Sequence, residues 1–218
     1  MSNSLLAELA ARVESMEGRT SGPSLPLAPV LRPLLPRGLQ AGCCYGVSGS
    51  LGLATALVAE ASARGEWCAL VGVPEFGAEA AAHLGFDLTR VVLVPDPRDA
   101  WLTVVATLIE VLPIVLVRPP ARLAPKELAR LESRLRRQGT VLVAVTEGAH
   151  RWPRAAATLE AGPSAWSGLA SGRGHLSERE LSVRVTERRG RETEVRLIQR
   201  RGAFVDATAV GAPIRAVS

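Results

Sequence analysis

The sequence predicts an α/β fold in which a mostly parallel sheet is flanked by helices and continues into a C-terminal antiparallel hairpin. Between residues 40 and 146, apolar runs of strand length alternate with helical patterns, as in repeated βα units. These runs are apolar throughout, which indicates strands buried on both faces and therefore parallel. After Ala149 apolar and polar residues alternate, which is typical of half-exposed antiparallel strands.

The composition predicts one sizeable soluble domain. The 218 residues are 47% hydrophobic and 22% charged, whereas aromatic residues make up only 4%, so we expect a mostly aliphatic core. Lys126 is the only lysine, and arginine supplies the remaining positive charge. Residues 151–218 hold 12 basic and 7 acidic side chains, against 14 of each in residues 1–150, so the net charge of +5 lies in the last third.

Cysteine and histidine positions favour neither a disulfide framework nor a metal site. The cysteines lie in apolar strand-like runs and the histidines are isolated: Cys43, Cys44, Cys68, His83, His150 and His175. We therefore expect core thiols, no metal and no cofactor. The apolar stretch Trp101–Leu112 is too short to span a bilayer, and the N-terminus lacks a leader pattern, so a cytoplasmic protein without membrane contact is expected.

The N-terminal part predicts a helix followed by a linker. Residues 1–17 form an amphipathic pattern whose apolar face carries Leu5, Leu6, Leu9 and Val13. Residues 18–36 contain five prolines and should form a linker that lies against the domain or bridges to a neighbour. The helix could dock on its own domain or on a partner. A core over 37–202 and a tail over 203–218 complete the expected organisation.

The elements of the core follow in a regular order. The expected strands are Cys43–Val47, Cys68–Val73, Val91–Val94, Ile114–Val117 and Val141–Thr146, and the expected helices are 53–64, 77–84, 98–112 and 125–138. The last helix is the clearest, because Pro125 suits its first turn, Leu131 and Leu135 face inward, and Gly139 follows its end. A short strand is expected between residues 147 and 167.

The terminal hairpin is predicted from two alternating runs around the turn Arg188–Arg191. The apolar positions are Leu181, Val183 and Val185 before the turn and Val195 and Leu197 after it. Six arginines concentrate around this hairpin: the candidate binding residues Arg188, Arg189, Arg191, Arg200 and Arg201, together with Arg196. They form either a patch that contacts DNA or an acidic partner, or a solvated face with interleaved glutamates. Trp152 and Trp166 could stack on bases or fill the core.

A glycine-rich turn follows the first expected strand, where a phosphate-binding loop would stand. The residues concerned are Gly46, Ser48, Gly49, Ser50, Gly52, Leu53 and Ala54. In the motif G-x-x-x-x-G-K-[ST] a lysine contacts the phosphates and a hydroxyl holds magnesium. Here Leu53 takes the lysine position and Ala54 the hydroxyl position, and Gly46 is one residue too early for the first glycine. The sequence thus predicts a nucleotide-binding fold without its nucleotide chemistry.

The order of these sequence segments along the chain resembles that of a known protein family. The segments Leu35–Leu39, Ala41–Thr55 and Leu84–Leu88 leading into Val91–Val94 resemble the ATPase core of RecA-type recombinases. With Gly168–Leu176 and the hairpin, residues 35 to 202 are similar to the degenerate RecA-like accessory proteins of the inducible bacterial mutasome, the ImuA group in its actinobacterial form.

This resemblance implies a non-catalytic, damage-induced role in error-prone translesion synthesis. The implied partners are a Y-family-like adaptor and a replicative-type error-prone polymerase, with RecA, weak DNA binding and a second copy of the chain as further candidates. Glu75 falls where the family's water-activating glutamate follows its second strand, and we interpret it as a relic. The acidic metal ligand expected after Ile114–Val117 is replaced by Arg118-Pro-Pro120.

Two other function classes stay open beside a scaffold. An ATP-binding regulator would need an arginine in place of the missing lysine, and none lies between Arg37 and Arg64. A DNA-binding module would rest on the basic hairpin. The combined loss of lysine, hydroxyl and acidic ligand favours a pseudo-ATPase scaffold without catalytic residues.

Overall fold

The structure, a computed structural model, describes residues 24–148, 151–170 and 173–205. Its strands are β1 (Ser24–Leu25), β2 (Leu39–Gln40), β3 (Cys44–Ser48), β4 (Cys68–Val71), β5 (Val91–Val94), β6 (Ile114–Val117), β7 (Val141–Thr146), β8 (Ala157–Ala170), β9 (Arg173–Glu187), β10 (Glu192–Arg200) and β11 (Ala203–Val205). The α-helices are α2 (Leu51–Ala63), α3 (Ala78–His83), α4 (Trp101–Val111) and α5 (Pro125–Gln138). Short 3-10 turns are η2 (Pro29–Leu31), η3 (Leu88–Arg90) and η4 (Arg98–Ala100).

Nine strands form one mixed sheet in the order β11-β10-β9-β8-β3-β7-β6-β4-β5. The strands β3 to β7 and the start of β8 pair in parallel, whereas β8 to β11 pair antiparallel. The predicted fold class is therefore confirmed. The expected strands coincide with β3 to β7 to within two residues because continuous apolar runs mark strands buried on both faces.

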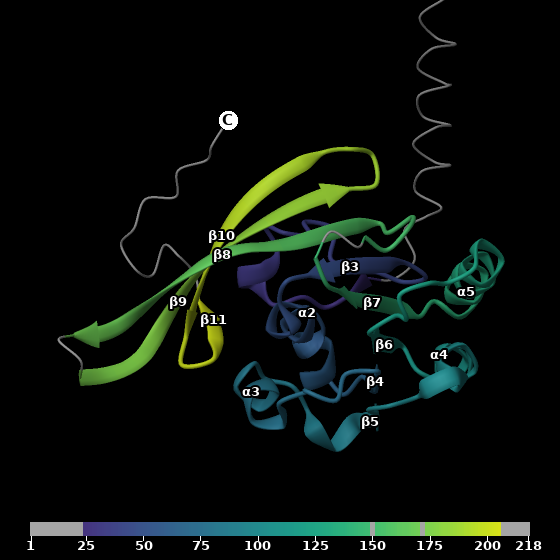
Figure 1. Ribbon diagram of the computed structural model, residues 1–218, viewed down its shortest axis with the longest axis horizontal. Coiled ribbons are helices and arrows are strands. Elements are labelled where there is room, and N and C mark those ends of the chain that lie inside the picture. Colours follow the sequence, from purple (N-terminus) through teal and green to yellow (C-terminus); the bar gives the residue numbers. More distant parts are fainter. Residues whose placement is uncertain (1–23, 149–150, 171–172, 206–218) are drawn as a thin grey trace, which may run out of the picture.

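Two helical layers cover the parallel part of the sheet, with α2 and α3 on one side and α4 and α5 on the other (Figure 1). Side chains alternate along each strand, so neighbouring residues serve different layers. In β3, Tyr45 and Val47 face the α2 layer, whereas Cys44 faces the layer of α4 and α5. Each layer has its own aliphatic cluster, as the scarcity of aromatic residues predicts.

The proline-rich segment lies against the domain over the residues that the structure describes. The strands β1 and β2 pair antiparallel, and Leu27, Leu31, Leu34 and Leu35 are buried in the α2 cluster. The prolines stop a long helix, and the leucines between them supply the apolar contacts. Residues 24–36 are therefore part of the folded core. The predicted helix with Leu5, Leu6, Leu9 and Val13, residues 18–23 and the tail from 206 lie outside the described residues.

Helix α5 has the bounds that its sequence predicts. Pro125 begins it, and the Glu127 side chain accepts a hydrogen bond from the Ala124 N–H at 2.9 Å. Leu131 and Leu135 are buried, and Gly139 ends the helix with a left-handed φ of +73°.

The terminal hairpin buries the predicted face, but β8 is longer than expected. Leu181, Val183, Val185 and Leu197 are buried at exposures of 2% or less. The sequence predicted only a short strand before them, because the segment Gly162–Ser164 interrupts the apolar pattern. In the structure this segment sits at a register irregularity between Ala161 and Ser164, and pairing with β9 continues beyond it. The β8–β9 ribbon extends away from the helical layers (Figure 1).

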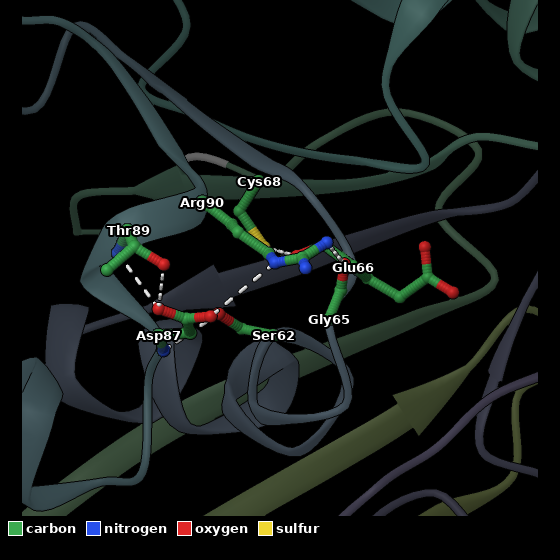
Figure 2. Close-up of polar contacts among 7 residues, drawn as sticks. All are labelled: Ser62, Gly65, Glu66, Cys68, Asp87, Thr89 and Arg90. Carbon is green, nitrogen blue, oxygen red and sulfur yellow. Dashed lines mark hydrogen bonds and ion pairs between the residues drawn. The ribbon is translucent and has the colours of Figure 1, made fainter.

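A polar cluster joins the end of α2 to the start of β5 (Figure 2). The Asp87 carboxylate accepts hydrogen bonds from the N–H and hydroxyl of Thr89, and the Asp87 N–H donates to Ser62 Oγ at 3.0 Å. Arg90 donates to the carbonyl of Gly65 at 2.8 Å. Beside it, burial raises the pKa of the Cys68 thiol to about 12, so this cysteine is a neutral core residue as expected.

No described helix is both long and apolar enough to cross a bilayer.

Candidate functional site

The turn between β3 and α2 is too short for a phosphate cradle. Only Gly49 and Ser50 separate the last residue of β3 from the first residue of α2. Gly49 has a left-handed φ of +78°, and a Cβ there would lie 2.8 Å from the carbonyl oxygen of Ala161. Since Ser48 pairs with Glu160 of β8, the continuation of β8 passes directly over the turn. The glycine permits this close approach of backbone to backbone.

Two amide groups in the first turn of α2, those of Leu53 and Ala54, donate to Ser50. Ser50 is the N-cap, and its Oγ accepts a hydrogen bond from the Leu53 N–H at 3.1 Å. In a phosphate-binding loop, free N–H groups of this first helical turn bind the phosphate oxygens. The Thr55 hydroxyl donates to the Leu51 carbonyl at 3.0 Å and so points into its own helix.

The position of the missing lysine faces the core. Leu53 and Ala54 are both fully buried in the α2 cluster. Gly46 lies inside β3, where a Cβ would contact Thr158 and Trp152, and Gly52 is exposed on the first turn of α2. The predicted loop residues thus belong to a strand, a two-residue turn and a helix, and they do not surround a common ligand position.

A second group gathers at the carboxyl ends of three neighbouring strands. Glu75 follows β4, Arg118 follows β6 and Glu147 follows β7. Arg118 donates a hydrogen bond to Glu75 through Nη2, and its Nε lies 3.7 Å from the Glu147 carboxylate. Trp101 of α4 holds the Arg118 backbone by donating to its carbonyl at 2.8 Å. Glu147 was not predicted, although an acidic residue directly after a buried strand is a usable signal.

The ion pair keeps Glu75 from acting as a free base. The hydrogen bond from Arg118 lowers the pKa of Glu75, and the same bond raises the pKa of Arg118. Both groups therefore stay ionised at neutral pH. The Arg118 guanidinium thus contacts both the Glu75 and the Glu147 carboxylates. Among the described residues, no three His, Cys, Asp or Glu side chains are grouped as metal ligands.

A polar groove of about 480 Å³ lies beside the turn, on the face of the hairpin that no helix covers. Ser48 and Gly49 form one wall, and β8, β9 and β10 form the other. Its charged side chains are mostly paired: Arg151 contacts Glu160 at 2.5 Å, and Ser182 donates to Glu194 at 2.5 Å. Arg184 is exposed in this groove and has no ion-pair partner among the described residues.

The predicted arginine patch of the hairpin is divided between two ends of β10. Arg188, Arg189 and Arg191 lie in the β9–β10 turn, whereas Arg200 and Arg201 lie at the far end of a nine-residue strand. At about 3.3 Å per residue these groups are about 30 Å apart. The expectation of one arginine patch is therefore corrected. Residues at the two ends of an extended strand are close in sequence but far apart in space.

The tryptophans have different environments. Trp152 is 4% exposed and covers Gly46, so it fills the core. Trp166 is 51% exposed on the β8–β9 ribbon, where the Arg179 guanidinium lies 5.5 Å from its ring centre.

Comparison with known proteins identifies the fold and the family. The crystal structure of the RadB recombinase matches with a TM-score of 0.54 at 17% identity, covering 82% of this chain and 97% of that chain. The fold and the turn define a RecA-like domain whose phosphate-loop position is filled by core side chains. Residues 33–154 match the family described as the MT3502 N-terminal domain, and the chain belongs to this family. The uncharacterized protein Rv3395c of Mycobacterium tuberculosis is 32% identical over 148 residues, which cover 66% of this chain and 69% of that protein.

Proposed function

We propose that this protein is a non-catalytic RecA-like accessory protein that acts through protein–protein contacts in a damage-inducible translesion synthesis complex. The observation that carries the non-catalytic part is the burial of Leu53 at the position of the phosphate lysine. The closed turn over Gly49 and the Arg118–Glu75 ion pair support the same conclusion, since each removes one requirement of ATP hydrolysis.

The assignment to a mutasome rests on the similarity of residues 35 to 202 to the ImuA group. The proposed partners are a Y-family-like adaptor, a replicative-type error-prone polymerase and RecA. A RecA-like domain that lacks a nucleotide site still presents a large surface of defined shape, and a scaffold needs such a surface to contact its partners. We place the protein in the cytoplasm, where such a complex meets DNA.

A nucleotide-binding role is the second candidate, and one observation favours it. Arg184 lines the groove beside Gly49 without an ion-pair partner among the described residues, so it could replace the missing lysine. Arg184 is far from the turn in sequence, and the pairing of β8 with both β3 and β9 brings it close.

Titration with magnesium ATP separates the two candidates. We expect no binding heat from the natural protein by isothermal calorimetry up to about 1 mM ATP, which corresponds to less than about 4 kcal/mol of binding free energy. An Arg184→Gln variant should behave identically. Micromolar binding that Arg184→Gln abolishes would contradict the non-catalytic proposal and establish the nucleotide-binding one.

The scaffold role predicts a complex that forms without nucleotide. Purified protein mixed with the Y-family-like adaptor of the same organism should co-elute in size-exclusion chromatography, with the same yield in the presence and absence of ATP. Serum albumin is a suitable control for non-specific association. Failure to co-elute at about 10 μM, a concentration at which a micromolar complex is mostly formed, would reject the proposed partner.

A further inference from the structure

Three segments that are distant in sequence meet at the amino edge of the sheet, where β3 and β7 begin. A Cβ on Gly42, just before β3, would lie 3.1 Å from the Cα of Arg136 near the end of α5. The Ala156 N–H donates to the Cys44 carbonyl at 2.7 Å, and the Arg188 N–H donates to the Ala156 carbonyl at 2.9 Å. The end of α5, the segment before β8 and the β9–β10 turn are therefore adjacent.

These segments bring together arginines that we name the amino-edge surface: Arg136, Arg137, Arg154, Arg188 and Arg191. Arg136 and Arg154 share one carboxylate, that of Glu132, at 4.0 and 3.4 Å. Two cations thus face one anion, and Glu132 is only 12% exposed. The surface lies at the opposite edge of the sheet from the β3–α2 turn.

The remaining members have no direct ion-pair partner among the described residues. The side chains of Arg137, Arg188 and Arg191 are exposed and have no ion-pair or hydrogen-bond partner among the described residues. The positive charges of Arg188 and Arg136 both act to lower the pKa of the nearby Cys43 thiol, although burial raises it more. The two segments therefore contribute to one local positive field.

The chemistry of this surface fits a phosphate backbone better than a protein. Protein interfaces are anchored by buried aromatic or aliphatic side chains. The exposed large hydrophobic side chains of the described residues are Trp67, Leu88, Leu93, Val111 and Trp166, and none belongs to these three segments. Guanidinium groups match the geometry of phosphate oxygens and attract a polyanion through counterion release.

We propose that the amino-edge surface binds the phosphate backbone of nucleic acid without reading its sequence. This goes beyond the proposed scaffold role and does not depend on it. The turn arginines Arg188 and Arg191 supply the free cations, and Arg136 and Arg154 extend the surface across the end of α5.

Fluorescence anisotropy with a labelled oligonucleotide of about 30 nucleotides, single-stranded and as duplex, tests the proposal. The natural protein should bind both probes, and its affinity should fall steeply with salt. An Arg188→Gln, Arg191→Gln variant should bind the duplex about 10-fold more weakly, with a salt slope reduced by about two, because each phosphate contact contributes about 0.9 to that slope.

A matched control removes the same charge from the opposite end of α5. Arg122→Gln, Lys126→Gln changes two exposed cations without ion-pair partners in the described residues. Lys126 lies in the first turn of α5, about 20 Å from the last residue of the helix, and Arg122 precedes the helix. This variant should bind like the natural protein, and circular dichroism should show that both variants are folded. No binding of either probe at about 50 mM salt, equal weakening in both variants, or stronger displacement by polyglutamate than by oligonucleotide would overturn the proposal. Failure of the natural protein to co-elute with the adaptor would instead count against the proposed adaptor partner and would leave the nucleic-acid proposal standing.

Discussion

Replacing Leu53 with lysine is expected to destabilise the domain strongly rather than to restore a nucleotide site. Leu53 is fully buried in the α2 cluster, and truncating such a leucine to alanine alone costs about 2–5 kcal/mol. A lysine at this position must in addition lose its charge or pull α2 from the sheet. We expect the free energy of unfolding to fall by about 3–5 kcal/mol, measured by urea denaturation followed by circular dichroism.

The neighbouring Gly52 provides the matched control. It is exposed on α2, and a Cβ there would contact only Ser50 Oγ at 3.9 Å. Gly52→Lys should change stability by about 0.5 kcal/mol or less, because the gain in helix propensity is offset by a positive charge near the helix N-terminus. A Leu53→Lys protein as stable as Gly52→Lys that also binds ATP would show that the lysine position is open, against the closed turn described above.

Gly49→Ala is expected to destabilise the protein through two separate effects. An L-residue at φ of +78° loses about 1–2 kcal/mol relative to glycine. The added Cβ would also lie 2.8 Å from the Ala161 carbonyl oxygen, so β8 must move away from the turn. We expect a total loss of about 3 kcal/mol in the free energy of unfolding, again from urea denaturation.

Gly190 separates the two effects. It has a nearly identical φ of +80°, and nothing lies within 4 Å of its added Cβ. Gly190→Ala should therefore cost only the conformational part, about 1 kcal/mol. The difference between the two variants measures how tightly β8 covers the β3–α2 turn. Equal losses would mean that β8 does not close this site.

The strands and helices of the parallel core could be predicted from the sequence because local residue patterns mark where each element begins, which face is buried and where it ends. The run Ile114–Val117 is apolar throughout and is fully buried as β6. In helix α5 the first residue, the buried face and the end are each marked by residues of typical type. The full length of strand β8 could not be predicted from local patterns. Its segment Gly162–Ser164 looks like a turn, and only pairing with β9 holds it in the sheet.

The candidate site was predicted in part. The absence of a phosphate lysine follows directly from the residues after Gly52, and Glu75 and Arg118 could each be singled out by their positions after strands. That these two form an ion pair depends on β4 and β6 being neighbours in the sheet, which no local pattern specifies. The covering of Gly49 by Ala161 likewise depends on β8 lying next to β3.

The arginines show most clearly which properties the sequence determines and which depend on the tertiary structure. Their excess in the last third of the chain, like the α/β class and the missing lysine, is a property of the sequence alone. Their grouping is not: Arg188 and Arg200 share one hairpin but lie at opposite ends of β10, whereas Arg136 and Arg154 converge on Glu132 from separate segments. Local patterns arise from interactions within a few residues. Proximity in space depends on strand order and direction, which are set by burial of the whole sheet between its two helical layers.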